Sequence, residues 1–159
     1  MINQAPINDM VLGLAAFLKA QLPSYITAVQ TAAGDGKVIP PPAGDPLVGY
    51  RDYSNAPAYP FVCVVLASGL VDPQAGGAQW VDATVDIGVA LVASEPTLLE
   101  KLLLRYLDAL INLVGENEGI GGVCDMSQVT GFDCGHGALG EKSAGTVVVT
   151  VTMRKEIQT

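Results

Sequence analysis

The only histidine, His136, is the residue best suited to acid–base chemistry near neutral pH. It lies two positions after Cys134 in the glycine-rich segment CGHGALGEKSAG, so one interpretation is a cysteine–histidine pair for nucleophilic catalysis. Residues two positions apart rarely point at each other on a strand or a helix. We therefore favour the alternative, a loop histidine beside an unrelated thiol, and predict that the protein is not an enzyme.

A metal site is a second interpretation of the same segment. Its ligands would be Cys124, Cys134 and His136, with Asp125 or Asp133 as a fourth. The spacing C-x9-C-x-H matches none of the common zinc patterns. The three cysteines are an odd number without a close pairing motif, which is typical of free thiols in a reducing cytoplasm. We therefore expect no metal and no cofactor.

Three further patterns bear on catalysis or ligand binding. Asp82 and Asp86 share one face of an expected strand, about 13 Å apart at about 3.3 Å per residue, which exceeds the separation of about 5–10 Å in glycosidases. The segment GENEGIGG at 115–122 follows a helix and lacks the Lys-Ser/Thr of a phosphate-binding loop. The prolines at 40–42 could form a polyproline ligand, but a rigid connection is the simpler interpretation.

The composition fits one domain over residues 1–159. Half of the residues are hydrophobic, the mean hydropathy is +0.39 and only 15% are charged, against about a quarter in a typical protein. Such a chain often buries part of its surface against other subunits. The net charge is -8 and no basic cluster is present, which disfavours binding to DNA or to an anionic membrane.

Neither a secretory signal nor a membrane span is expected. The N-terminus, MINQAPIND, lacks a basic region followed by an apolar run. The longest apolar stretch, 102–114, is interrupted by Arg105, Asp108 and Asn112, unlike a membrane-spanning helix. We expect a protein that is made and assembled in the cytoplasm.

The elements that position these residues begin with an amphipathic helix over 8–22. Asn8 is its expected N-cap, and the apolar residues from Ile7 to Leu22 recur at helical spacing. Pro23 is expected to interrupt it, with a second helix over 24–33 that ends at the Gly34-Asp35-Gly36 turn. Residues 37–60 hold six of the ten prolines and predict a long irregular arm.

The rest of the chain predicts two strand pairs separated by a helix. Strands are expected at 61–68, 80–92 and 146–153, with a short one near 123–132 and glycine-rich loops at 69–79 and 115–145. Ser94 is the expected cap of a helix with Glu95 and Pro96 in its first turn and its body over 97–114, which stops at Gly115. The fold class is therefore α+β, with a mostly antiparallel four-stranded sheet and helices packed on one face.

The helix over 97–114 has an apolar surface wider than one sheet can cover, because its polar residues cluster in one narrow arc. Either the N-terminal helix or another subunit must cover the remainder. The tyrosines of the 37–60 arm also need a surface, on the same subunit or on a neighbour. Candidate residues for an oligomer or tube interface are therefore Tyr50, Tyr53, Tyr59, Trp80, Leu104, Leu107 and Ile111.

Four segments together resemble one protein family. They are NDMVLGLAAFLKAQLP, YPFVCVVLASG after the arm, ATVDIGVALVASEPTLLEKLLLRYLDALINLV, and the closing GTVVVTVTMRKEI. The third, a strand that enters a long helix with an Arg-Tyr-Leu-x-Ala-Leu core, is the most distinctive. Over most of its length the chain resembles the tail-terminator or tail-completion (neck, minor tail) proteins of long-tailed bacteriophages.

The resemblance implies a structural virion protein that forms a ring, usually a hexamer. Such a ring caps the tail tube, ends its polymerisation and offers the head-docking surface. Its partners would be the tail-tube protein and a head-completion or connector protein, and DNA would pass through the lumen without specific binding. The contact regions would be 40–60, 69–80 and 115–145.

Two alternatives remain open. One, in the same system, is a head–tail connector or stopper, or a tail-tube subunit. The other, from a different class, is a small cytoplasmic enzyme or ligand-binding domain that uses Cys134 and His136.

Overall fold

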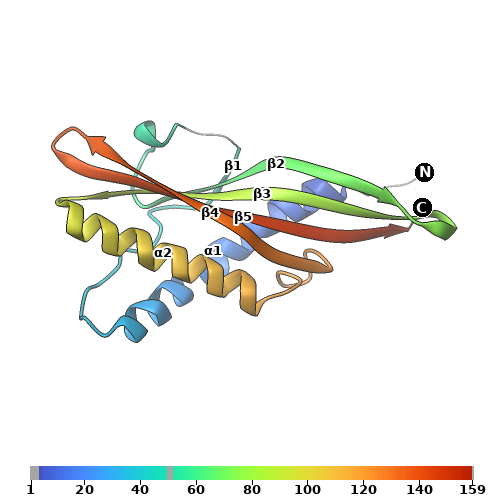
Figure 1. The fold of residues 1–159 in the computed structure, drawn as a ribbon, viewed down its shortest axis with the longest axis horizontal. Helices are drawn as coiled ribbons and strands as arrows, with labels where there is room; N and C mark the ends of the chain where they lie inside the picture. Colours follow the sequence, from blue (N-terminus) through green and yellow to red (C-terminus); the bar gives the residue numbers. More distant parts are fainter. Residues whose placement is uncertain (1–3, 50–51, 159) are drawn as a thin grey trace.

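The computed structural model describes residues 4–49 and 52–158 and shows an α+β fold (Figure 1). The two helices are α1 (Pro6–Ala33) and α2 (Pro96–Glu116). The five strands are β1 (Leu47–Val48), β2 (Phe61–Pro73), β3 (Ala78–Ala93), β4 (Met126–Leu139) and β5 (Lys142–Gln158). Short 3-10 turns lie at Tyr53–Asn55 and Ala75–Gly77.

The strands form one sheet in the order β1-β2-β3-β5-β4. β1 is parallel to β2, and every other neighbouring pair is antiparallel. The predicted mostly antiparallel sheet is confirmed, but the predicted number of four strands is wrong. The fifth strand, β1, is two residues long, which is too short to produce an alternating pattern in the sequence.

Both hairpins are longer than the sequence indicates. β2 continues through Gly69 to Pro73, and β4 continues beyond Phe132 through Gly135 to Leu139, where loops were expected. Each extension is paired residue by residue with its neighbouring strand. A partner strand satisfies the backbone hydrogen bonds of these glycines, so tertiary pairing overrides their weak strand propensity.

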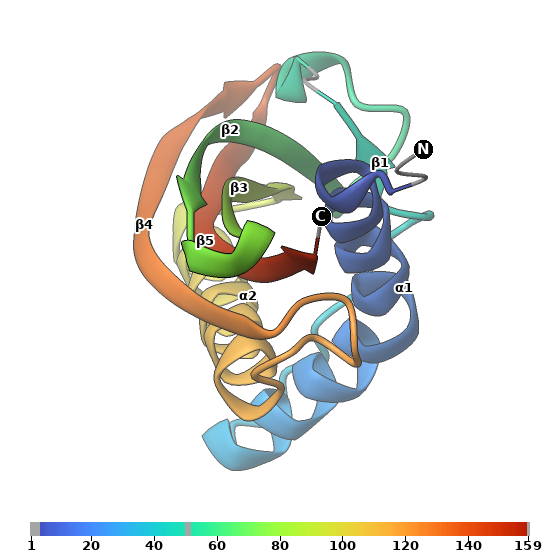
Figure 2. The ribbon, with the colours of Figure 1, turned by 90° about the vertical axis from the view of Figure 1, so that its right-hand side faces the viewer.

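The core lies between the helices and one face of the sheet. The odd-numbered residues in the middle of β3 and β5, such as Val85, Ile87 and Val149, are fully buried in it. The opposite face carries half-buried polar residues, including Thr84 and Asp86. Figure 2 shows both helices beside the same, concave side of the twisted sheet.

α1 is one continuous helix, so the predicted break at Pro23 is wrong. Its buried stripe runs unbroken past the proline, because Leu22 before it and Ile26 after it are both buried. The Thr27 hydroxyl donates a hydrogen bond to the Pro23 carbonyl at 3.1 Å. The helix begins at Pro6 and not at Asn8, and it ends at Gly34, which has the left-handed φ of 65° typical of a helix C-terminus.

By length and composition α1 is also apolar enough to cross a membrane, with a mean hydropathy of 1.2 over its most apolar window. Core helices meet the same criterion. The stripe from Met10 to Val29 is packed into the core formed with α2 and the sheet.

α2 begins one residue later than predicted and extends two residues further at its C-terminal end. Its N-cap is Glu95 and not Ser94, with Pro96 as the first helical residue, and it continues through Gly115. Most of its wide apolar surface is covered by α1 and the sheet, so that Leu103, Tyr106 and Leu110 are buried. The part of the apolar surface of α2 that the sheet leaves uncovered is therefore covered mainly by the N-terminal helix.

Residues 37–60 do not form a proline-rich arm, because the segment folds back onto the body. Ile39 is buried, and its backbone N–H donates to the Gln30 side chain at 2.7 Å. The Tyr106 hydroxyl donates to the Pro40 carbonyl at 2.6 Å, and Ala43 N–H donates to the Pro60 carbonyl at 2.9 Å. These hydrogen bonds fix a segment whose prolines cannot join a central strand.

Candidate functional site

The predicted interface residues of α2 differ in exposure. Leu104 is 51% exposed. Leu107 is buried, and Ile111 is half-buried and packs against the core. Only Leu104 of these three presents most of its side chain to a partner. The predicted Tyr50 lies outside the described residues.

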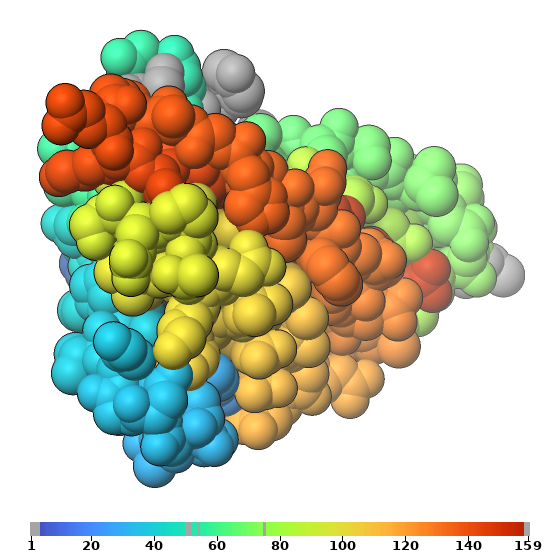
Figure 3. Space-filling model, turned by 60° about the vertical axis from the view of Figure 1, so that its left-hand side comes forward, coloured from blue at the N-terminus to red at the C-terminus, as the bar shows by residue number. Residues whose placement is uncertain are grey.

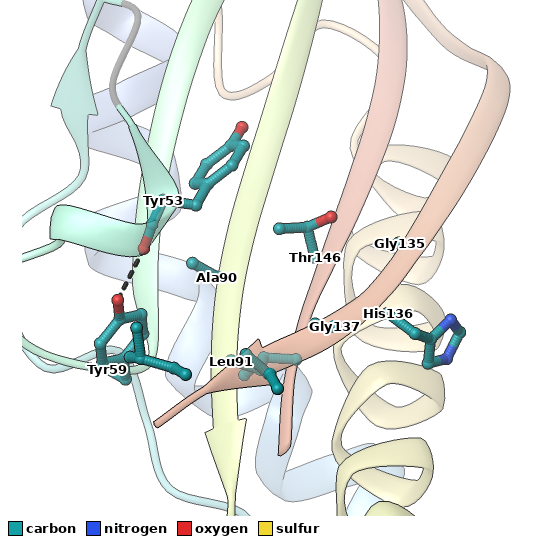
Figure 4. Close-up of a pocket in the computed structure, with 12 residues that line it drawn as sticks. Tyr53, Tyr59, Ala90, Leu91, Gly135, His136, Gly137 and Thr146 are labelled. Carbon is teal, nitrogen blue, oxygen red and sulfur yellow. Dashed lines mark hydrogen bonds between the residues drawn. The ribbon is translucent and has the colours of Figure 1, made fainter. Parts of the chain in front are cut away.

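Tyr53 and Tyr59 pack on their own subunit, over the sheet face away from the helices. They form a small cluster with Phe61, Cys63 and Ala90. The Tyr59 hydroxyl donates to the Tyr53 carbonyl at 2.6 Å, as Figure 4 shows, and the Tyr53 hydroxyl lies 3.4 Å from the Cys63 sulfur. Both hydroxyls are thus engaged within the chain.

A pocket of about 250 Å³ lies between these tyrosines and the β4–β5 hairpin. Most of its wall is made of small residues, namely Ala90, Gly135, Gly137, Ala138, Ala144, Gly145 and Thr146, with Leu91 and Leu139. In Figure 4 the ring of His136 points away from the pocket toward α2. Its Nε2 lies 2.9 Å from the Glu100 carboxylate, so the imidazole is not directed at a molecule in this pocket.

Cys134 and His136 pair with Val147 and Gly145 of β5, and so lie on the helix-facing side of β4. Partial burial is the main cause that raises the pKa of the Cys134 thiol, and the charges of Asp133 and Glu100 raise it further. A nucleophilic cysteine needs the opposite shift. The geometry therefore offers no activated thiol at this position.

The proposed metal ligands are not gathered in space. Within residues 4–49 and 52–158 there is no group of three His, Cys, Asp or Glu side chains that could hold a metal ion. Cys124 is buried, and burial raises the pKa of its thiol to about 11.

Trp80 is half-buried and packs beside Arg154, whose guanidinium lies 5.4 Å from the ring centroid. The same guanidinium binds the Asp82 carboxylate through two hydrogen bonds of 2.6 and 2.8 Å, which lower the pKa of Asp82. Asp86 accepts a hydrogen bond from the Thr150 hydroxyl at 2.8 Å. The two carboxylates are therefore each bound to β5 and do not act as a pair.

The structure reveals a feature that the sequence did not, namely two free edges of the sheet. Beyond Val64, β2 pairs only with β3, and β4 pairs only with β5 along its whole length, within the described part of the chain. Large apolar side chains lie exposed on both: Leu66, Leu70 and Val71 on β2, and Met126 and Phe132 on β4. Free strand edges of this kind can pair with another chain.

The two edges are on opposite sides of the sheet. Figure 3 shows β4 at the surface beside α2, while the β2–β3 hairpin projects beyond the helices. For the free edge of β2, the available sequence signal was GLVDP at 69–73, but its glycine indicated a loop.

No protein-family model matches this chain, and no curated protein matches it.

Proposed function

We propose that this protein is a structural subunit of a bacteriophage tail, which forms a ring that caps the tail tube, ends its polymerisation and provides the head-docking surface. The observation that carries the assembly role is the exposed apolar end of β2. Every residue from Leu66 to Pro73 is exposed, including Leu66 at 45%, Leu70 at 72% and Val71 at 58%.

Exposed aliphatic side chains on a projecting hairpin favour a partner surface. Full burial of one Leu or Val side chain is worth about 1.5–3 kcal/mol. Contiguous apolar patches on a soluble protein commonly mark interaction sites. The hairpin projects beyond its own helix layer, so contacts with a second chain are the direct way to bury it.

The step from an assembly subunit to a tail terminator rests on the resemblance in sequence. The charge of -8 is compatible with DNA sliding through a lumen, because an acidic wall does not bind phosphates. In this role the partners are further copies of the chain, the tail-tube protein and a head-completion or connector protein. The protein is assembled in the host cytoplasm and becomes part of the virion.

A head–tail connector or a tube subunit is the alternative within the same system. A tube subunit stacks without limit, whereas a terminator stops at one ring. A small ligand-binding domain or enzyme is the alternative of another class, and the pocket beside Tyr53 and Tyr59 favours it. Substitution His136→Ala tests the enzyme alternative that would use Cys134 and His136, since assembly does not require this imidazole.

The test of the assembly role compares two exposed leucines. Leu70→Asp places a charge on the projecting edge, and Leu12→Asp places one on α1, where Leu12 is 50% exposed. We expect Leu70→Asp to abolish the oligomers that the wild type forms, alone or with tail tubes, in analytical ultracentrifugation while Leu12→Asp retains them, with both variants folded by circular dichroism. Equal oligomer content in the two variants would count against the proposal.

A further inference from the structure

We propose that neighbouring copies join by antiparallel pairing of the free β2 edge of one copy (66–73) with the free β4 edge of the next. This inference rests on the proposed ring-forming function and names the surfaces that would build the ring. A contact between two different surfaces of the same chain is head-to-tail, and such contacts form a ring when the rotation between successive copies closes.

Strand direction fits this pairing. From β2 to β4 the sheet takes three antiparallel steps, β2 to β3, β3 to β5 and β5 to β4, so β2 and β4 run in opposite directions. Rotation about an axis along the strands keeps each direction unchanged. The β2 edge of the next copy therefore arrives antiparallel to β4, and the alternation continues across the boundary.

The exposed apolar residues of the two edges lie opposite each other when neighbouring copies are not shifted along the strand direction. One row of paired residues crosses the whole sheet from Leu70 on β2 to Met126 on β4, on the face away from the helices. A second row runs from Leu66 to Val129 on the helix-facing side. Copies that are not shifted thus place Leu70 beside Met126, which are 72% and 51% exposed, and Leu66 beside Val129.

Each edge strand carries one β-bulge, after Leu66 on β2 and after Val129 on β4, but most other protections against pairing are missing. Natural edge strands are often blocked by lysines, prolines or inward-pointing charges. Neither 66–73 nor 126–139 contains a lysine, and the one proline, Pro73, stands at the very end of β2. On β4 the side chain of His136 is turned toward Glu100 of α2. Each edge can therefore accept a strand along most of its length.

Disulfide cross-linking tests the pairing. Cys134, the exposed thiol, is replaced by Ser, and Cys63 and Cys124 remain because they are buried. Into this background go Leu70→Cys and Met126→Cys together. Residues directly opposite on paired strands have Cβ atoms about 4.5–5.5 Å apart, close to the reach of a disulfide. The matched control pairs Val71→Cys with Met126→Cys, since adjacent strand residues point to opposite faces.

We expect mild oxidation of the Leu70/Met126 variant to give a ladder of covalent oligomers on a non-reducing gel, at least tenfold more than the Val71/Met126 control. Rings that form without this cross-link, or with equal cross-linking in the control, would overturn the edge pairing and leave the proposed function standing. A chain that stays monomeric and does not bind tube ends would overturn both.

Discussion

The guanidinium of Arg105, in the middle of α2, donates a 2.6 Å hydrogen bond to the carboxylate of Asp35, which lies just after α1. Lys101 lies 3.6 Å from the same carboxylate. The Arg105 side chain is only 11% exposed, so Asp35 supplies the negative charge for a nearly buried cation. This contact fixes the C-terminal end of α1 against α2.

Removal of that carboxylate should destabilise the fold. Asp35→Asn leaves a mostly buried guanidinium without its counter-charge, which is far more costly than loss of an exposed pair. The control is Asp45→Asn, which breaks a 3.1 Å pair with Lys19 whose side chains are 62% and 69% exposed and which should have little effect. The urea midpoint should fall clearly for Asp35→Asn only, and equal midpoints would contradict this role.

The same carboxyl should make stability depend on acid pH. The backbone N–H of Lys37 and the Arg105 guanidinium lower the pKa of Asp35 from 3.8 to about 2. A pKa lowered by folding gives stability that is present above the unfolded value and is lost as the pH falls through the folded value. The wild type should therefore lose more stability than Asp35→Asn between about pH 4 and about pH 2. Parallel urea titrations across this window would show it, and identical slopes would refute it.

Replacement of Pro23 by alanine should stabilise the protein. Proline in a helix interior is less favourable than alanine by about 3 kcal/mol, because it removes a backbone donor and crowds the preceding turn. Pro23 is exposed, so the change removes little packing. We expect Pro23→Ala to raise the free energy of unfolding by about 1–3 kcal/mol. Pro6→Ala, at the favourable first position of the same helix, should not, and a gain equal to that of Pro23→Ala would contradict the explanation.

The hydroxyl of Tyr106 should hold the segment after α1 in place. It is fully buried and donates to the Pro40 carbonyl at 2.6 Å. Tyr106→Phe removes this hydrogen bond, whose net contribution is about 0.5–1.5 kcal/mol, and should speed proteolysis between 37 and 46. Tyr25→Phe, which loses an exposed hydrogen bond to Glu116 and one accepted from Asn117 but does not touch the segment after α1, is the control. Unchanged proteolysis in Tyr106→Phe would show that this bond does not fix the segment.

The sequence predicted the elements whose patterns depend on one core face. The alternation along β3 and the helical spacing around Leu103 and Tyr106 arise from burial against a single layer, so they are visible locally. The end of α1 was predicted from the glycine at position 34. Gly34 has a left-handed φ there, a conformation that favours glycine.

The missed features depend on partners far away in the sequence. Leu22 and Ile26 keep α1 helical through Pro23 by packing on α2 and the sheet, and β3 and β5 convert the glycine-rich 69–73 and 133–139 into strands. For the same reason, the sequence did not predict which of the candidate interface residues would be exposed. Leu107 is as apolar as Leu104, and only the tertiary packing decides that Leu104 is the exposed one.

The central claim is that this chain assembles into a closed ring, and native mass spectrometry of the purified protein, alone and with tail tubes, tests it most directly. The account predicts one oligomer of fixed mass, formed by the chain alone or on contact with tubes, and no indefinite series of larger species. A strictly monomeric protein that also fails to bind tube ends would contradict it.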